Sequence, residues 1–332
     1  MKTNNIVISS RIRLARNLND YPFSNNTNLE SAGAVLTKVF SAISNVGNFN
    51  NYKLKNLSKF TLDELLEDHL ISAELIENSD ISGVAISEDK TVSIMVNEED
   101  HLREQCILKG LDLKRAYDII NDIDTELNLN LNFAYDKTFG YLTACPTNVG
   151  TGIRASVMMF LPGICLTNNF EEMVNAVSKL GICVRGAYGE GSQANGYMFQ
   201  ISNQFTLGKT EDEIIQLVES TVLKICDLEE KARKNLLINN EYKLTNDVYR
   251  AYGILSNCYL ISSSEACELL SKLKLGVALN IITLKNNDVI DEMLSNISAC
   301  KINNLSGSEL NETERDKFRA QYLGRILKNL RI

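Results

Sequence analysis

The most informative absences in this sequence are long apolar runs and an excess of positive charge. No apolar run reaches the roughly 20 residues that a membrane-spanning helix needs, and the N-terminus lacks the apolar core of a secretion signal. The chain has 34 lysines and arginines against 42 aspartates and glutamates, a formal net charge of −8. This balance argues against general binding to nucleic acid or to anionic membranes. We therefore expect a cytoplasmic protein with neither kind of partner.

Several common motifs are absent as well. The eight cysteines are scattered without a C-x-x-C pair, which argues against a disulfide framework and against a zinc site. No segment matches the phosphate-binding loop G-x-x-x-x-G-K-[ST], and the H-R-D and D-F-G elements of ordinary protein kinases are missing. We predict no dedicated protein metal site, and any nucleotide chemistry must rest on other residues.

The composition is that of a globular protein with a large core, since the chain has 332 residues, of which 44% are hydrophobic and 23% charged. Alternating apolar residues indicate a strand at 5–13 and a hairpin at 83–96, whereas helical periodicity covers about 30–76 and 111–127. A capping box at Thr210 opens a long helix. Beyond the charged stretch 229–234 every segment has helical periodicity, so we predict domains at 1–235 and 236–332.

The segment NEEDHLR, residues 97–103, directly follows the second strand of the hairpin. Carboxylates packed together repel each other and lose solvation, so a fold does not need such a cluster for its stability. The plain alternative is a solvated acidic turn. His101 lies inside this cluster, and we assign it no chemical role.

Five arginines lie at the edges of polar or glycine-containing turns: Arg11, Arg13, Arg103, Arg154 and Arg185. The first two are two residues apart, so in an extended chain both face the same side; taken alone, they are more typical of a solvated edge strand than of a ligand site. Arginine binds phosphate bidentately and keeps its charge. In an acidic protein without a phosphate-binding loop, the whole set suits the neutralisation of a triphosphate.

Two carboxylates adjoin these arginines. Glu99 precedes Arg103 closely, and Glu190 lies in a glycine-rich loop after Arg185. Paired carboxylates suit a planar cation such as guanidinium, which offers parallel N–H donors. Cys145, among threonine, asparagine and glycine, fits a polarised thiol or, equally, a small buried residue beside a turn. Phosphoryl transfer needs mainly alignment and charge stabilisation, which such residues could supply.

The segments SSRIRLAR, NEEDHLR, CPTNVGTGIRAS and RGAYGEG occur in this order, and together they resemble the catalytic domain of phosphagen (guanidino) kinases over residues 5–235. The resemblance implies an α+β fold, an antiparallel sheet flanked by helices, with ATP and Mg²⁺ as cofactors. It assigns the five arginines to the nucleotide phosphates, and it assigns Glu99 and Glu190 to the guanidinium, whose deprotonation they assist. Cys145 corresponds to the active-site thiol of the family.

One histidine also matches the family pattern. On its own, His69 near a helix end is typical of a structural residue, but the resemblance places it near the nucleotide base. A second histidine, which the family carries four residues after Arg154, is Met158 here. The base contacts therefore depart from the pattern.

The remainder of the chain resembles one branch of this family. The chain begins about nine residues before the SSRIR segment, so we expect the small N-terminal domain of arginine and creatine kinases to be absent, while a helical region follows residue 235. With the loop at 186–191 and the RDKFRA element, this resembles bacterial protein arginine kinases of the McsB type. The resemblance implies phosphorylation of exposed arginines in proteins, which marks them for a Clp ATPase and its protease in the stress response. It also implies a zinc-binding activator protein (McsA type) and a homodimer or higher oligomer.

The RDKFRA element has two interpretations. Arg315 and Arg319 are one helical turn apart and Asp316 is adjacent, which is typical of an ordinary charged helix face. The resemblance instead implies an allosteric phosphoarginine-binding site formed by these three residues, in an all-α C-terminal domain that also serves dimerisation.

Three functions follow from these observations. The first is a protein arginine kinase, the second a phosphagen kinase acting on free arginine, and the third a non-catalytic phosphoarginine-binding adaptor. The expected absence of the N-terminal domain speaks against the second. The presence of Glu99, Glu190, Cys145 and all five arginines speaks against the third.

Overall fold

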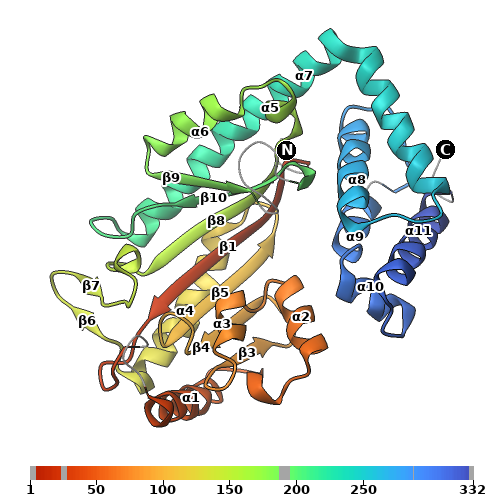
Figure 1. Ribbon diagram of the computed structural model, residues 1–332. Helices are drawn as coiled ribbons and strands as arrows, with labels where there is room; N and C mark the ends of the chain where they lie inside the picture. Colours follow the sequence, from red (N-terminus) through yellow and green to blue (C-terminus); the bar gives the residue numbers. More distant parts are fainter. Residues whose placement is uncertain (1–4, 24–27, 187–194, 287, 329–332) are drawn as a thin grey trace.

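The centre of the computed structural model, which describes residues 5–23, 28–186, 195–286 and 288–328, is an eight-stranded antiparallel sheet with the order β2-β3-β4-β5-β1-β8-β10-β9 (Figure 1). Its strands are β1 (Val7–Arg16), β2 (Phe49–Lys53), β3 (Gly83–Ser87), β4 (Val92–Val96), β5 (Leu102–Lys109), β8 (Ile153–Phe160), β9 (Ile182–Gly186) and β10 (Met198–Asn203). A separate hairpin pairs β6 (Tyr135–Asp136) with β7 (Gly140–Tyr141).

Helices flank this sheet and continue beyond it. They are α1 (Leu29–Ile43), α2 (Lys59–Glu67), α3 (Ala73–Glu77), α4 (Leu113–Leu131), α5 (Pro162–Leu166), α6 (Phe170–Ser178), α7 (Glu211–Asn257), α8 (Ser263–Ala278), α9 (Val289–Asn296), α10 (Ala299–Ser306) and α11 (Glu312–Lys328). The predicted α+β class, an antiparallel sheet flanked by helices and followed by a helical C-terminal region, is confirmed. None of the described helices is both long and apolar enough to cross a membrane.

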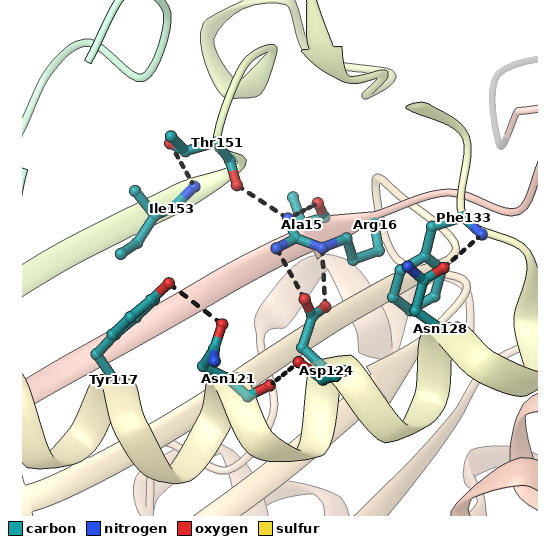
Figure 2. A network of polar contacts seen from close by, with 10 residues as sticks. Ala15, Arg16, Tyr117, Asn121, Asp124, Asn128, Phe133, Thr151 and Ile153 are labelled. Carbon is teal, nitrogen blue, oxygen red and sulfur yellow. Dashed lines mark hydrogen bonds and ion pairs between the residues drawn. The ribbon is translucent and has the colours of Figure 1, made fainter. Parts of the chain in front are cut away.

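One face of the sheet is covered by α4 and α7 and forms the main core. On β1, the fully buried Ile12 and Leu14 alternate with Arg11 and Arg13. Because side chains alternate across a strand, packing the apolar pair against the helices turns both arginines to the opposite face. Arg16 at the end of β1 faces the core side, where it forms a two-armed ion pair with Asp124 of α4 (Figure 2).

The opposite face is covered only in part. The helices α2 and α3 pack over the β3–β4 end of the sheet, where Leu65, Leu75, Val84 and Met95 belong to one buried cluster. Toward β1, β8 and β10 this face carries polar side chains instead. The structure thus separates an apolar face, which holds the fold together, from a polar face on the central strands.

The long helix α7 joins the sheet to the C-terminal helices. The capping box predicted at Thr210 is present, because the Thr210 side chain accepts from Glu213 N and the Glu213 carboxylate accepts from Thr210 N. The helix passes through residue 235 and has non-helical backbone at Asn240, so the boundary at 235 stays a prediction. Its second half packs with α8, α9 and α11 around a second buried cluster that includes Val248, Leu270 and Leu323. In addition, α10 contacts α2, as Figure 1 shows.

Several elements differ from the sequence predictions, and three of them bear on the site. The stretch predicted as helical, 30–76, contains β2, a mostly exposed edge strand whose sequence FNNYK has too few apolar residues to show an alternation. The strand β5 begins inside the acidic segment, so Arg103 lies on a strand. Polar residues on both faces of β5, such as Glu104 and Gln105, hid its period of two. The short helix α10 was also missed.

Candidate active site

Four of the predicted arginines lie together on the polar face of the central strands. Arg11 and Arg13 come from β1, and Arg13 pairs directly with Arg154 of β8. Arg103 of β5 pairs with Ala15, the next residue of β1 on the same face. Directly paired residues of antiparallel strands point to the same side. The exposed Arg185, near the end of β9, joins this face through its pairing with β10.

The charge of this arginine cluster (Arg11, Arg13, Arg103, Arg154 and Arg185) is poorly compensated by the described residues. Burial and the neighbouring Arg154 lower the pKa of Arg11 to about 10, and burial with Arg11 and Arg154 lowers the pKa of Arg103 to about 10. Burial and Arg185 also lower the pKa of Arg154. Within the described part of the chain, the buried Nε atoms of Arg13 and Arg154 have no hydrogen-bond partner. Such a cluster is suited to a polyanion.

Neutral side chains of β8 and β10 orient two of these guanidinium groups. Arg11 Nη2 donates to Gln200 Oε1 at 2.5 Å, and its Nε lies 3.5 Å from Ser156 Oγ. Arg154 Nη2 donates to Ser202 Oγ at 3.1 Å. Since none of these acceptors is charged, they fix the positions of the guanidinium groups while leaving the positive charge available to a ligand.

The acidic segment places its carboxylates in three different environments. Glu98 is buried and accepts from Ser72 Oγ and from Arg103 Nη1. Burial raises the pKa of Glu98 to about 7. Glu99, the predicted catalytic carboxylate, is exposed at the turn. Glu98 thus anchors one member of the arginine cluster, and Glu99 remains free to meet a substrate.

Asp100 joins this turn to the loop that carries Cys145. Its Oδ1 accepts from Asn17 Nδ2 and from Ala144 N, both at 2.6 Å. Cys145 is half-buried, and its Sγ lies 3.1 Å from Thr147 Oγ1. The structure therefore brings the Glu99 turn and the thiol together, although they are far apart in the sequence.

His101 has a structural role in this turn. Its Nδ1 accepts from Leu18 N at 3.0 Å, so its Nε2 carries the proton and donates to Pro22 O at 3.0 Å. Burial lowers the pKa of His101, which favours this neutral form. His101 thus connects the acidic turn to the segment that follows β1.

His69 follows α2 at the polar face. Gln105 of β5, on the same face as Arg103, donates from Nε2 to the His69 carbonyl at 2.7 Å. Desolvation by the surrounding protein and the positive charge of Arg11 lower the pKa of His69. The structure thus places His69 beside the arginine cluster, and its contact with a nucleotide base stays a prediction. Met158 of β8 lies on the same face, where it pairs with Gln200.

Two further predictions concern residues that are not part of this described site. Glu190 lies outside the described residues. In α11, Arg319 is 2% exposed and donates from Nε to Ile297 O at 2.7 Å, and from Nη1 to Ile261 O at 2.8 Å and to Asp316 at 2.6 Å. Arg315 donates to Leu310 O at 2.7 Å. These bonds serve the fold, and phosphoarginine binding by the three residues stays a prediction.

Sequence reasoning missed the residues that orient the predicted ones, namely Glu98, Asp100, Gln105, Ser156, Gln200 and Ser202. A signal for four of them was present in the pairs Arg103-x-Gln105, Arg154-x-Ser156 and Gln200-x-Ser202. Each pair has the spacing of two that puts polar residues on one face of a strand. Recognising it requires knowing that these segments are strands of one sheet.

The fold and the arginine cluster define a class of enzyme, the ATP:guanido phosphotransferases. The family model described as the ATP:guanido phosphotransferase C-terminal catalytic domain matches residues 32–232. The crystal structure of lombricine kinase has a TM-score of 0.61 and 28% identity, covering 68% of this chain and 67% of that chain. The duplicated taurocyamine kinase from Schistosoma mansoni, with bound transition state analog components, has a TM-score of 0.64 and 27% identity, covering 77% of this chain and 38% of that chain.

The comparisons also identify the branch of this class: the chain belongs to the protein-arginine kinase family. The model of the protein-arginine kinase McsB C-terminal domain matches residues 241–331. A protein-arginine kinase of Halothermothrix orenii is 44% identical over 320 residues, which cover 96% of this chain and 92% of that protein. One from Clostridium kluyveri is 43% identical over 325 residues, with 96% and 93% covered. One from Clostridium tetani is 38% identical over 330 residues, with 99% and 97% covered.

Proposed function

We propose that this protein transfers the γ-phosphoryl group of ATP to the guanidinium groups of arginine side chains in proteins. The observation that carries the proposal is the arginine cluster, whose partly buried positive charge lies beside the exposed Glu99 and the half-buried Cys145. Relatives named protein-arginine kinase, aligned over nearly the whole chain, support the choice of a protein substrate.

In this proposal the arginine cluster binds the phosphates of ATP and stabilises the charge on the transferred group. Glu99 orients the guanidinium, together with Glu190, which the family pattern assigns to the same task. As a guanidinium nitrogen forms its bond to the γ-phosphorus, the bond from phosphorus to the ADP oxygen breaks and its electron pair leaves with ADP. The nitrogen gives up one proton, which Glu99 accepts, and Cys145 contacts the guanidinium from the neighbouring loop.

Mg²⁺ would enter as part of the nucleotide. Within the described part of the chain, no group of three histidine, cysteine or acidic side chains converges as a metal site. Mg²⁺ commonly keeps several water molecules and binds phosphate oxygens, supplemented by one or two carboxylates. We therefore assign it to the ATP phosphates and derive no step from it.

The deciding experiment offers MgATP together with either an arginine-rich unfolded protein or free L-arginine. Phosphorus NMR at neutral or alkaline pH would detect the acid-labile P–N bond. We expect label on protein arginine alone, and no label with the Glu99→Gln variant, which should still bind ATP. Label on free arginine would instead support a phosphagen kinase. Binding of phosphoarginine without any transfer would support an adaptor.

Further features of the family pattern belong to the same proposal. We propose that the phosphorylated proteins are marked for a Clp ATPase in the stress response, and that a zinc-binding activator stimulates the enzyme in the cytoplasm. The C-terminal domain, residues 236–332, would mediate dimerisation and sense phosphoarginine. Arg315→Ala tests the last point: transfer without added phosphoarginine should persist, and the response to added phosphoarginine should disappear. An unchanged dose response would leave RDKFRA as an ordinary helix face.

A further inference from the structure

In the turn that follows α2, His69 occupies a backbone position that glycine usually takes. Leu70 N donates to Leu65 O and His69 N donates to Leu66 O, both at 3.0 Å, which is the Schellman pattern that closes a helix. His69 occupies the left-handed position of this motif, with φ of 58°. Glycine usually takes this position, because a side chain there costs about 1 kcal/mol. Histidine at this position therefore makes the turn less stable than glycine would.

The sheet holds this turn from the inner side. Gln105 is 2% exposed, and its Nε2 donates to the His69 carbonyl at 2.7 Å and to Ser93 Oγ at 3.1 Å. Leu65 and Leu70, on either side of the motif, are buried in the same apolar cluster. These contacts fix the backbone of the turn over the polar face, next to the arginine cluster.

A second set of contacts holds the turn from the outer side, and it comes from the C-terminal helices. Glu67, the last residue of α2, accepts from Ser298 Oγ at 2.6 Å and from Cys300 N at 3.2 Å. The Ser298 side chain makes no capping bond to its own helix α10. Glu67 instead satisfies one of the free N–H groups at the start of that helix.

Two neighbours strengthen this contact between α2 and α10. Lys301 Nζ lies 2.5 Å from Asp68 Oδ1, and Asn304 Nδ2 donates to Glu64 Oε1 at 2.9 Å. The side chains of the Lys301–Asp68 pair are only 22% and 21% exposed. Residues 64–68, which lead directly into His69, are thus bonded to one helix of the C-terminal region.

We propose that Glu67 is a positioning residue for the nucleotide, which acts by bonding α10 to the end of α2 and so holding His69 against the base. The C-terminal helical region then supports the nucleotide-binding site through the contact between α10 and α2. This inference rests on the proposed function and on the family resemblance, which places His69 near the base of ATP. Because Met158 replaces the second base histidine of the family pattern, nucleotide affinity depends more heavily on His69.

The experiment measures KM for ATP and kcat with an unfolded protein substrate for four variants. Glu67→Ala removes both bonds to α10, Ser298→Ala removes one of them, and His69→Gly removes the ring while keeping a residue suited to the turn. Glu77→Ala is the control, because Glu77 is exposed at the end of α3 and has no ion pair or side-chain hydrogen bond among the described residues. Circular dichroism and thermal unfolding establish that each variant is folded.

We expect His69→Gly to raise KM for ATP about tenfold and Glu67→Ala about three- to tenfold, changes that correspond to about 0.7–1.4 kcal/mol of binding. The value of kcat should stay within about twofold, because the phosphate and guanidinium contacts are untouched. The double variant Glu67→Ala/Ser298→Ala should be no worse than Glu67→Ala alone, since Glu67→Ala already removes the bond that Ser298→Ala removes. Glu77→Ala should match the wild type.

The outcomes distinguish a failure of the proposed function from a failure of the positioning role of Glu67. If the wild type transfers no phosphoryl group, the proposed function itself fails. If it is active but His69→Gly leaves KM unchanged, the base contact is absent and the positioning role is lost with it. If His69→Gly raises KM while Glu67→Ala and Ser298→Ala, both folded, do not, the contact with α10 serves only the fold and the inference is overturned.

Discussion

Two kinds of arginine occupy the same strand, three residues apart, and they differ in almost every physical respect. Arg16 faces the helical side of the sheet and binds Asp124 with Nε at 2.8 Å and Nη2 at 3.1 Å. Its Nη1 donates to the carbonyls of Ala15 and Thr151 (Figure 2). Its guanidinium carbon lies 3.5 Å from the centre of the Tyr141 ring. Arg13 faces the other side, beside Arg154 and the rest of the cluster.

The difference shows in the direction of the pKa values. Burial lowers the pKa of Arg11, Arg103 and Arg154, whereas at Arg16 the charge of Asp124 overrides burial and the net shift of the pKa is upward. At Arg11 burial and the charge of Arg154 lower the pKa to about 10, and at Arg103 burial and two neighbouring arginines do the same, although Glu98 accepts a hydrogen bond from the Arg103 guanidinium. The paired arginine therefore serves stability, whereas the cluster is maintained for a ligand that brings the missing negative charge.

The largest effect should come from removing the paired arginine. Arg16→Met would leave Asp124 buried without its cation, so we expect the free energy of unfolding to fall by about 3–5 kcal/mol. Urea denaturation followed by circular dichroism measures this. The control Arg115→Met removes an arginine whose side chain is 71% exposed, and it should change stability by less than about 0.5 kcal/mol. Equal effects of the two variants would contradict the comparison.

Removing a member of the cluster should have the opposite pattern. Arg154→Met relieves repulsion with Arg185 and removes a buried Nε that lacks a partner in the described structure. We expect thermal stability to be equal or higher and kcat/KM to fall about 100-fold or more, because a preorganised charge is lost. Differential scanning calorimetry and phosphoryl-transfer assays on the same sample test both parts. A destabilised variant with retained activity would mean that Arg154, like Arg16, serves the stability of the fold.

A smaller effect concerns Glu104, which is fully buried near Arg16 and Asp124. Burial and then the charge of Asp124 raise the pKa of Glu104 well above its ordinary 4.5. The folded protein thus keeps a proton that the unfolded chain has released, so wild-type stability should fall as pH rises above about 4.5, by up to about 1.4 kcal/mol per pH unit.

Glu104→Gln should lack this component of the pH dependence. We measure the free energy of unfolding at pH 5, 6, 7 and 8. The stability of the variant relative to the wild type should increase as pH rises, up to the folded-state pKa of Glu104. If the two curves run parallel across this range, Glu104 is ionised in the folded protein. The helix-covered face of the sheet, where Arg16 pairs with Asp124, then carries more negative charge than we infer.

The smallest effect should come from the turn above the cluster. His69→Gly removes the penalty of a side chain in the left-handed conformation but adds flexibility to the unfolded chain, so the two terms should cancel to within about 0.5 kcal/mol. His69→Val should cost about 1–2 kcal/mol, because a β-branched residue tolerates this conformation poorly. Chemical denaturation of the two variants provides the test. A large loss with glycine would mean that the ring itself stabilises the fold.

Much of the polar face could be predicted from the sequence, because the period of two on a strand is a local property. The spacing of Arg11 and Arg13 placed both on one face, and the structure agrees. The hairpin at 83–96 and the capping box at Thr210 were local signals of the same kind. By contrast, the strand β5 was missed because Glu104 is polar yet buried, which breaks the expected alternation.

The contacts between distant segments could not be predicted. The bond from Asp100 to Ala144 and the bonds from Glu67 to α10 depend on how separate elements meet, which no short pattern encodes. The distinction between Glu98 and Glu99 is of this kind too, since neighbours in sequence became a buried ion-pair partner and an exposed carboxylate. Family resemblance selected Glu99, and geometry accounts for the different environment of Glu98.

The helix α7 has a consequence for dividing this protein into modules. Its kink lies at Asn240, five residues past the predicted boundary at 235. Leu236, just past the predicted boundary, packs with Phe160 of the sheet and with Leu275 of α8, and Arg233 donates to the Phe160 carbonyl at 3.2 Å. A fragment that stops at 235 would uncover Phe160 and end in the middle of a helix. Chimeras that exchange the C-terminal region should therefore be joined beyond Leu244, with its apolar partners exchanged as a set.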